Sequence, residues 1–417
     1  MELTATIEAL VGHCRSENWA GYDPYDTLNS QLLRKLGLLN LTFTRLVFTQ
    51  LLKRSPVNLK GLLLIPKEQN PKGIAVFLSA LVRLSRIELC PAGEAKELAD
   101  RLLELRSKNQ PRSCWGYNFD WQTRGCLIPR GTPNIICTTF AANALVDAYE
   151  TFGDSAFLEA AVSAGHFLLE GLNITRCDDS ICFSYTPLDH YQVHNASLLG
   201  ACLLARLHNL QPNKDFDSHA AGAVRFSLAR QCPDGSWPYG EGEKQKWIDS
   251  FHTGYNLVAL ERIRRFSELP GVASAIRNGY KFYLDNFFEP GGVAKYFNNK
   301  TYPVDAHSIA QAFVTLVELE DYDERSAGIA LEVYGWTLKN MRSPRGWYYY
   351  QKHSWWTNRV SYMRWSQAWM LLGLAYLAQR QHADAPNYCA KKSATGQGDQ
   401  ASQPASVKSE VILNHHS

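Results

Sequence analysis

Three histidines stand near the predicted starts of three apolar helices and could transfer protons at neutral pH. His194, His252 and His307 are separated by 58 and 55 residues. An imidazole titrates near neutrality, which suits general acid or base catalysis. One histidine near a helix start is commonly structural, but three at one register favour a shared cavity. They lack HxH or HExxH spacing, so we predict no metal site.

The densest group of candidate residues lies within 237–252. It contains Trp237, Tyr239, Glu241, Asp249 and His252, immediately before an apolar helix whose N-terminal dipole favours an anionic ligand. Asp249 is the strongest candidate for catalysis or for orienting His252, and Tyr239 is a further acid or base. Trp237 and Glu241 are expected to bind substrate. Alternatively, Asp249 caps the helix and Trp237 packs in the core.

Other aromatic and charged side chains in the predicted loops and helix starts are candidates for binding a saccharide. They are Trp115, Tyr117, Asp120, Tyr349, Arg359, Arg364 and Trp365. Aromatic residues make up 12% of the chain, and flat rings at partly wet positions suit stacking on sugars. Arg359 and Arg364 are expected to clamp a carboxylate. Core packing is the alternative for the rings.

An internal repeat must position these side chains. The tyrosines of five aromatic loops are 68, 54, 57 and 53 residues apart, at Tyr117, Tyr185, Tyr239, Tyr296 and Tyr349. The helices after them are 57, 58, 53 and 59 apart, centred on Ala144, Ala201, Ala259, Ala312 and Leu371. These helices are apolar nearly all round, as in 198–205, whereas the helix that follows each is more polar. The period of about 55 residues predicts stacked helical hairpins in an all-α (α/α)6 toroid, with the apolar helices inside.

The repeat also divides the chain. We expect N-terminal helices in 1–70 that close or flank the toroid, with 27–53 closing the ring against a helix over 363–379. The toroid itself is expected over 71–381, and includes a further helix pair over 72–88 and 92–107. The tail, 382–417, is rich in Ser, Ala, Gln and Lys without apolar periodicity, which predicts disorder.

Several motifs resemble a known family. They are GYDPYD at 21–26, WGYNFDWQ at 115–122, FSYTP at 183–187, GSWPYGE at 235–241, WIDSFHTG at 247–254 and YMRWSQAW at 362–369. These runs resemble a prokaryotic (α/α)6-toroid family often encoded among polysaccharide biosynthesis genes. That fold is shared with six-hairpin glycosidases, polysaccharide lyases and uronate 5-epimerases. The resemblance covers about residues 15 to 380 and implies an oligosaccharide or polysaccharide partner.

Three functions are compatible with these residues. The favoured one is proton abstraction next to a uronate carboxylate, giving 5-epimerisation or β-elimination, with His194, His252, His307, Tyr239 or Tyr349 as acids and bases. The second is glycoside hydrolysis, in which Asp249 pairs with Asp120, Glu241 or Asp305. The third is a glycan-binding or scaffold protein without catalysis.

Charge and composition restrict the partners. The net charge of +3 gives no sign of a nucleic-acid ligand, and no GxSxG, Walker or GxGxxG motif introduces a helix, so we expect no cofactor. Residues 28–86 carry ten basic residues against Glu68. With apolar residues such as Phe48 and Leu51, this segment is expected either to contact an anionic membrane surface or to close the toroid with its charges solvated. Because the N-terminal residues lack a signal-peptide pattern, we expect a cytoplasmic protein, peripheral at the inner membrane face if the segment binds lipid.

Overall fold

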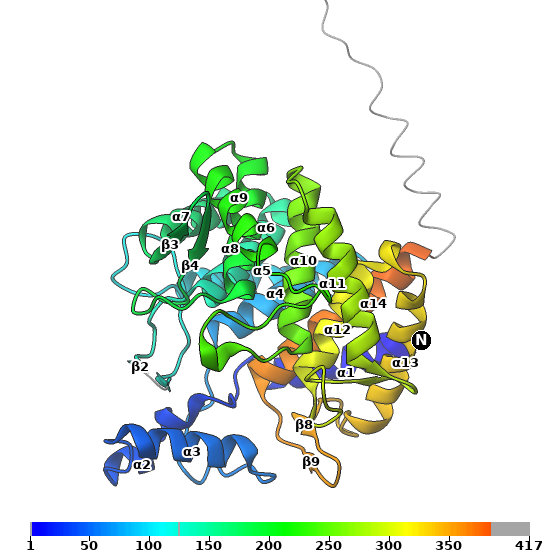
Figure 1. Ribbon diagram of the computed structural model, residues 1–417. Coiled ribbons are helices and arrows are strands. Elements are labelled where there is room, and N and C mark those ends of the chain that lie inside the picture. Colours follow the sequence, from blue (N-terminus) through cyan, green and yellow to red (C-terminus); the bar gives the residue numbers. More distant parts are fainter. Residues whose placement is uncertain (1, 124–125, 385–417) are drawn as a thin grey trace, which may run out of the picture.

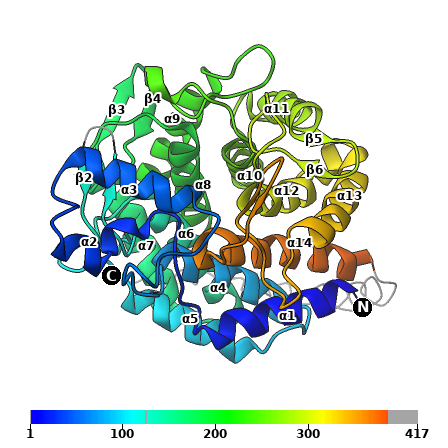
Figure 2. The same cartoon turned by 90° about the horizontal axis from the view of Figure 1, so that it is seen from below.

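Two concentric rings of helices make up most of the chain, as the computed structural model shows over residues 2–123 and 126–384 (Figures 1 and 2). The inner helices are α4 (Pro71–Ser85), α6 (Ile135–Phe152), α8 (His194–Leu210), α10 (Ser250–Phe266), α12 (Ala306–Glu318) and α14 (Trp369–Asp384). The outer helices are α5 (Ala92–Glu104), α7 (Ser155–Glu170), α9 (Lys214–Leu228), α11 (Val272–Phe287), α13 (Arg325–Asn340) and α1 (Glu2–Ser16). The predicted (α/α)6 toroid is confirmed, and the helices around Ala144, Ala201, Ala259 and Ala312 all lie in the inner ring.

The ring closes because each inner helix packs on the next, and α14 packs on α4. The sixth hairpin joins the two ends of the chain, since α14 packs against α1. Leu3, Ile7 and Leu10 form the buried stripe of α1. The closing helix is therefore α1, whereas the sequence predicted one from 27–53, a segment whose helices bury few apolar side chains.

Residues 26–54 instead form η1 (Asp26–Asn29), α2 (Gln31–Lys35) and α3 (Thr42–Arg54), which lie beyond one end of the ring (Figures 1 and 2). Leu52 is the only fully buried residue of α3, whereas Leu41, Phe43 and Leu51 are exposed. The described helices include none that is long and apolar enough to cross a membrane. Most of the tail predicted to be disordered, 385–417, lies outside the described residues.

Short antiparallel strands fill the loops that precede the inner helices. They are β1 (Trp121–Gln122) with β2 (Leu127–Ile128), β3 (Ile174–Cys177) with β4 (Ser180–Phe183), β5 (Phe288–Glu289) with β6 (Val293–Ala294), and β7 (Val304–Asp305) with β8 (Gln351–Lys352) and β9 (Thr357–Asn358). Short 3₁₀ turns occur at η2 (Glu243–Gln245) and η3 (Glu320–Tyr322), and a π-helical turn, η4 (Met363–Ala368), leads into α14. The strands, η2 and η4 gather at the end of the ring where the inner helices begin, whereas η3 follows the end of α12.

Polar side chains cap four inner helices at that end. Asn70, Asn134, Asp249 and Asp305 accept hydrogen bonds from backbone N–H groups in the first turns of α4, α6, α10 and α12. Capping satisfies N–H groups that would otherwise lack partners within the protein. The capping alternative for Asp249 is therefore correct, and the same carboxylate has further contacts described below.

The close packing of α10 on α12 predicts a mutational effect. A Cβ atom on Gly254 would lie 2.6 Å from the Thr315 hydroxyl and 2.8 Å from Cγ of Gln311, whereas one on Gly328 of α13 would meet nothing within 4 Å. We expect Gly254→Ala to lower the free energy of unfolding by about 1 to 3 kcal/mol. Gly328→Ala should instead raise it by about 0.5 to 1 kcal/mol, because alanine favours the helix. Urea unfolding measures both, and equal effects would contradict the inner packing.

Candidate functional site

A cavity of about 430 Å³ lies at the end of the ring where the inner helices begin. Its wall is mainly aromatic, with rings from Tyr25, Tyr117, Phe119, Trp121, Tyr185, Tyr239, Trp247, Phe251, Tyr255, Tyr296, Phe297 and Trp365. The other lining residues are Lys72, Ile136, Asn195, His252, His307 and Arg364. We call this space the aromatic cavity. A few polar groups in a concave, mostly apolar wall are typical of small-molecule sites.

The second residue of five inner helices, and the second residue of the π-helical turn that leads into the sixth, lines this cavity. Lys72, Ile136, Asn195, Phe251 and His307 occupy that position in α4, α6, α8, α10 and α12, and Arg364 occupies it in the π-helical turn before α14. The repeat therefore projects one side chain from each of six units toward a common space.

Asp249 holds the ring of His252 in a fixed orientation. The carboxylate accepts hydrogen bonds from the His252 backbone N–H at 3.0 Å and from Trp247 Nε1 at 3.0 Å, and it lies 2.7 Å from His252 Nδ1. An ionised carboxylate only accepts, so Nδ1 carries the proton and the Nε2 atom of a neutral ring is left as an acceptor. The His252 side chain is 20% exposed, in contrast to the fully buried side chain of Asp249. This is the geometry of a general base positioned by an acid.

His307 and Tyr255 form a second hydrogen-bonded pair on the wall of the aromatic cavity. His307 Nε2 is hydrogen-bonded to the Tyr255 hydroxyl, and its Nδ1 is buried without a partner in the described structure. The imidazole stacks between Phe251 and Trp369, with centroids 4.6 and 4.3 Å away. Burial, with nearby Lys72 and Arg364, lowers the pKa of His307 well below its ordinary value, so the ring is neutral at pH 7. Burial also raises the pKa of Tyr255, which keeps its phenol protonated.

Lys72 is a buried amine among aromatic rings. Its Nζ lies 4.7 Å from the ring centre of Phe140, 5.3 Å from Trp369 and 5.7 Å from Tyr255. Burial, and then the like charge of Arg364, lowers its pKa to about 7. No carboxylate pairs with Lys72 among the residues the structure describes. The amine is therefore close to its titration midpoint at neutral pH and is available to a ligand.

Arg364 is already engaged by a carboxylate. Its Nε and Nη2 donate to the two oxygens of Asp23 at 2.5 and 2.8 Å, and both side chains are buried. The guanidinium also lies over the ring of Tyr117, 5.2 Å from its centre. Arg364 thus lines the aromatic cavity, but its charge is compensated within the protein. It ties the loop containing Tyr25 to the start of α14.

The remaining predicted residues near the aromatic cavity hold the loops together. The Trp365 indole N–H donates to Asp305 at 3.0 Å, and burial raises the pKa of that carboxyl to about 6. Tyr117 is hydrogen-bonded to Tyr185 at 3.3 Å, hydroxyl to hydroxyl. The Tyr239 ring stacks on Trp247 at 4.5 Å, between centroids.

The third predicted histidine lies outside the aromatic cavity. His194 is fully buried, with Nε2 2.9 Å from Glu241 and Nδ1 3.3 Å from Ser227. Glu241 lies beside Arg230 and Lys246. Because His194 occupies the first position of α8, the neighbouring Asn195 lines the cavity in its place.

Two tryptophans that were predicted to stack on a sugar are buried in the core instead. The Trp115 indole donates to the carbonyl of Leu102, the Trp237 indole donates to the carbonyl of Ser227, and both rings are buried. Neither ring lines the aromatic cavity.

The other three predicted binding residues also lie away from that cavity. Asp120 pairs with Arg34 at 2.8 Å and accepts the backbone N–H of Arg130. Arg359 lies over the ring of Tyr349, 5.6 Å from its centre. These contacts join loops to one another at the surface.

Comparison with known proteins places the fold among solved structures. No family model matches the chain, and no curated protein matches its sequence. The structure is similar to cellobiose 2-epimerase from Bacillus thermoamylovorans, with a TM-score of 0.58 and 12% identity over 75% of this chain and 88% of that one. A polysaccharide lyase matches with a TM-score of 0.58 and 9% identity, over 92% of this chain and 98% of that one. A GH76 α-mannanase from Bacteroides thetaiotaomicron matches with a TM-score of 0.54 and 12% identity, over 75% and 86%. These similarities show the (α/α)6-toroid fold.

The buried amine predicts an unusual pH dependence of stability. The unfolded lysine binds a proton up to about pH 10.5, whereas the folded one releases it near pH 7, so its cost to stability is full below pH 7 and fades as the pH rises. We expect Lys72→Met to raise the free energy of unfolding at pH 6 by on the order of 3 kcal/mol, with a smaller gain at pH 9. Lys281→Met, at a lysine 76% exposed, should show no such trend in urea unfolding at several pH values. A loss of stability at pH 6 in Lys72→Met would contradict the buried, uncompensated amine.

Proposed function

We propose that the protein binds a saccharide in the aromatic cavity and transfers a proton at a carbon next to a carboxylate or carbonyl group. The observation that carries this proposal is the Asp249–His252 pair, which presents an acceptor nitrogen at a wall of aromatic rings. Structural similarity to an epimerase, a lyase and a mannanase supports a carbohydrate substrate. The aromatic wall supports it independently, because rings stack on the apolar faces of sugars.

On a uronate, the reaction would begin with transfer of the C5 proton to Nε2 of His252. The electron pair of the broken C–H bond moves into the carboxylate, and a cation or hydrogen-bond donors must stabilise the charge that develops there. Lys72 is our candidate for this role, since Arg364 is bound to Asp23. The pKa of about 7 lets the Lys72 amine hold a proton near neutral pH, and the protonated form is the one that this step uses. Return of a proton to the opposite face of C5 gives the 5-epimer, and the Tyr255 and His307 pair is our candidate for the group that supplies this proton. Expulsion of a leaving group from C4 gives the unsaturated product instead.

The same residues suit a ring-opened sugar. There the proton leaves C2, next to the carbonyl carbon, and its return to the other face gives the 2-epimer. D-mannose isomerase and cellobiose 2-epimerase, to which the fold is similar, are named for reactions of neutral sugars. The substrate arms of the experiment below distinguish this reaction from the uronate reaction.

Hydrolysis is less well supported. Asp249 and Asp305 are both buried, and each accepts hydrogen bonds from a tryptophan indole and a backbone N–H. Glu241 and Asp120 do not line the aromatic cavity. Among the described residues, the cavity therefore lacks the two facing carboxylates that flank a glycosidic bond in hydrolases. A scaffold role without catalysis is less well supported too, since side chains do not fill the cavity.

Replacing the carboxylate of Asp249 tests the proposed base. Asp249→Asn preserves size and capping ability but removes the charge that orients His252, so turnover should fall about tenfold or more while folding is retained. The matched control is Asp154→Asn, at a capping aspartate on outer helix α7, which should leave turnover unchanged.

The measurement is deuterium uptake in deuterated water. Uronate-containing oligosaccharides and neutral reducing disaccharides are incubated separately, and unsaturation and chain cleavage are followed alongside. Deuterium at C5 supports the uronate reaction, and deuterium at C2 supports the neutral-sugar reaction. Cleavage with an unsaturated product supports elimination from the uronate, whereas cleavage with neither unsaturation nor deuterium on carbon would favour hydrolysis. Full activity of both Asp249→Asn and His252→Gln would place the site elsewhere.

A second proposal concerns α2 and α3, which we propose contact an anionic membrane surface. Nine large apolar side chains in and beside these helices are exposed, namely Leu36, Leu38, Leu41, Phe43, Leu51, Val57, Leu59, Leu62 and Leu64. They are interspersed with basic residues, including Arg34, Lys35 and Arg54. Exposed apolar groups beside cations suit the interface of an anionic bilayer. The same segment contacts the cavity wall, because Lys53 donates to the Tyr25 hydroxyl.

Vesicle flotation tests the membrane proposal. Binding to vesicles containing phosphatidylserine should be strong at low salt and weaker at high salt, because surface charges are screened. Phe43→Ser should reduce binding several-fold by removing a ring that is 74% exposed. Leu331→Ser, at a leucine 63% exposed on outer helix α13, is the control and should bind as the unmodified protein does. Absence of salt-sensitive binding would remove this proposal.

A further inference from the structure

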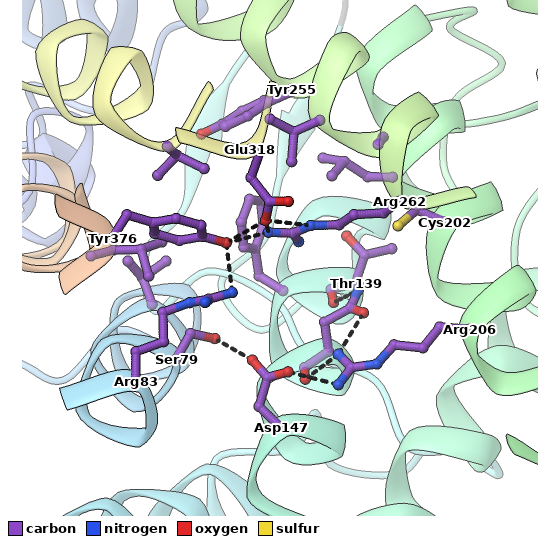
Figure 3. A pocket seen from close by; sticks show the side chains of 18 of the residues that line it. Ser79, Arg83, Thr139, Asp147, Cys202, Arg206, Tyr255, Arg262, Glu318 and Tyr376 are labelled. Atoms are coloured by element: carbon purple, nitrogen blue, oxygen red, sulfur yellow. Dashed lines mark hydrogen bonds and ion pairs between the residues drawn. The ribbon is translucent and has the colours of Figure 1, made fainter. Parts of the chain in front are cut away.

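A second cavity lies at the opposite end of the ring, where the inner helices end (Figure 3). Its volume is about 290 Å³. Tyr255 lines both cavities, and its ring packs against Phe140 and Trp369, with centroids 5.7 and 5.4 Å away. These three rings separate the aromatic cavity from the second one, which we call the arginine cavity.

Each inner helix contributes one polar side chain to the arginine cavity at a common register. The six are Arg83, Asp147, Arg206, Arg262, Glu318 and Tyr376, and they are 64, 59, 56, 56 and 58 residues apart. Figure 3 shows them arranged around one space, with one set of contacts joining Asp147 to Arg206 and another joining Arg262, Glu318, Tyr376 and Arg83. The repeat that builds the first site therefore also builds a second polar ring.

The carboxylates of this ring are already paired. Asp147 lies 2.7 Å from Arg206, while Glu318 contacts Arg262 at 2.7 Å and Arg265 at 2.9 Å. The neighbouring guanidinium groups lower the pKa of Asp147, and they lower that of Glu318 to about 2. Both acids therefore remain ionised at neutral pH and are held by arginines rather than open to a cation.

Positive charge is in excess in the arginine cavity. Its lining includes five guanidinium groups and three carboxylates, namely Arg83, Arg86, Arg206, Arg262 and Arg265 against Asp147, Glu150 and Glu318. Arg83 has only neutral partners, since it donates to Gln379 at 2.8 Å and to the Tyr376 hydroxyl at 2.7 Å. Its Nε is buried and has no partner in the described structure. The guanidinium of Arg83 thus forms no ion pair with a carboxylate among the described residues, although Asp147 and Glu318 are near enough for its charge to lower the pKa of both.

We propose that the arginine cavity binds a small oxyanion of the phosphate type. Guanidinium groups that approach from several helices suit a tetrahedral anion, and an excess of two positive charges matches the charge of phosphate near neutral pH. The helix C-termini at this end also favour cations. That effect accounts for arginines near the helix ends, but it gives no reason for 290 Å³ of open space between them. The apolar walls, which include Leu199, Val258 and Leu372, leave room for a small organic group attached to the anion.

This proposal does not depend on the proposed function, and calorimetric titration with inorganic phosphate tests it directly. Binding should be measurable at low salt and weaken as sodium chloride is added. Arg83→Gln removes a positive charge without leaving a carboxylate unpaired, and it should weaken phosphate binding tenfold or more. Lys281→Met, at an exposed lysine of outer helix α11, is the control and should bind phosphate as the unmodified protein does.

A variant that removes a negative charge instead of a positive one keeps the test decisive if Arg83→Gln fails to fold. Glu150 is partly exposed and lies 2.9 Å from Arg206, so Glu150→Gln raises the excess charge and should tighten phosphate binding about threefold or more. Glucose 6-phosphate and glucose, titrated in parallel, distinguish a sugar-phosphate ligand from free phosphate. The proposal is overturned if the unmodified protein binds neither phosphate nor glucose 6-phosphate. It is also overturned if Arg83→Gln folds and binds phosphate as tightly as the unmodified protein. If Arg83→Gln does not fold, the proposal is overturned when Glu150→Gln binds phosphate no more tightly than the unmodified protein. The arginines would then only balance carboxylates and helix ends.

Discussion

Burial of the inner helices on every side is the constraint on which the rest of the structure depends. Each inner helix packs against two inner neighbours and an outer partner, so its middle turns carry apolar or small side chains. Polar groups are costly there unless they are paired. The charged groups of the inner helices therefore gather mainly where the helices begin or end. The two cavities occupy these two places, and the rings of Tyr255, Phe140 and Trp369 fill the space between.

The sequence predicted the toroid because hydrophobic pattern and repeat period are set locally. It also predicted that polar groups at the inner-helix starts meet, and His252, His307 and Arg364 do so. It did not identify Lys72, although the period places this residue at the same helical position as His307. Comparison of the second residue of each apolar helix across the repeats would have pointed to Lys72. The aromatic motifs were harder to interpret, because the same ring type packs in the core at Trp237 and lines the cavity at Trp247.

Pairings between distant segments could not be predicted from the repeat. The closing helix was assigned to 27–53, yet α1 closes the ring, because the choice depends on which stripe buries more apolar area rather than on position along the chain. Arg364 was predicted as a carboxylate clamp for a ligand, and it binds the protein's own Asp23. An aspartate 341 residues away leaves no local pattern. This buried pair fixes the N-terminal loop, and with it Tyr25, against the start of α14.

The two cavities differ in whether their charged groups are paired with opposite charges or surrounded by apolar rings. In the arginine cavity every carboxylate has a guanidinium partner, so its groups stay ionised and attract a counter-ion. In the aromatic cavity the rings exclude water, and burial disfavours the charged forms of both Lys72 and His307. A neutral imidazole accepts a proton, whereas an imidazolium does not. Desolvation by the aromatic wall thus keeps His307 neutral. In the reaction that we propose, the carboxylate of Asp249 would stabilise the cation that His252 becomes when it accepts the proton, and Lys72 would act in its protonated form.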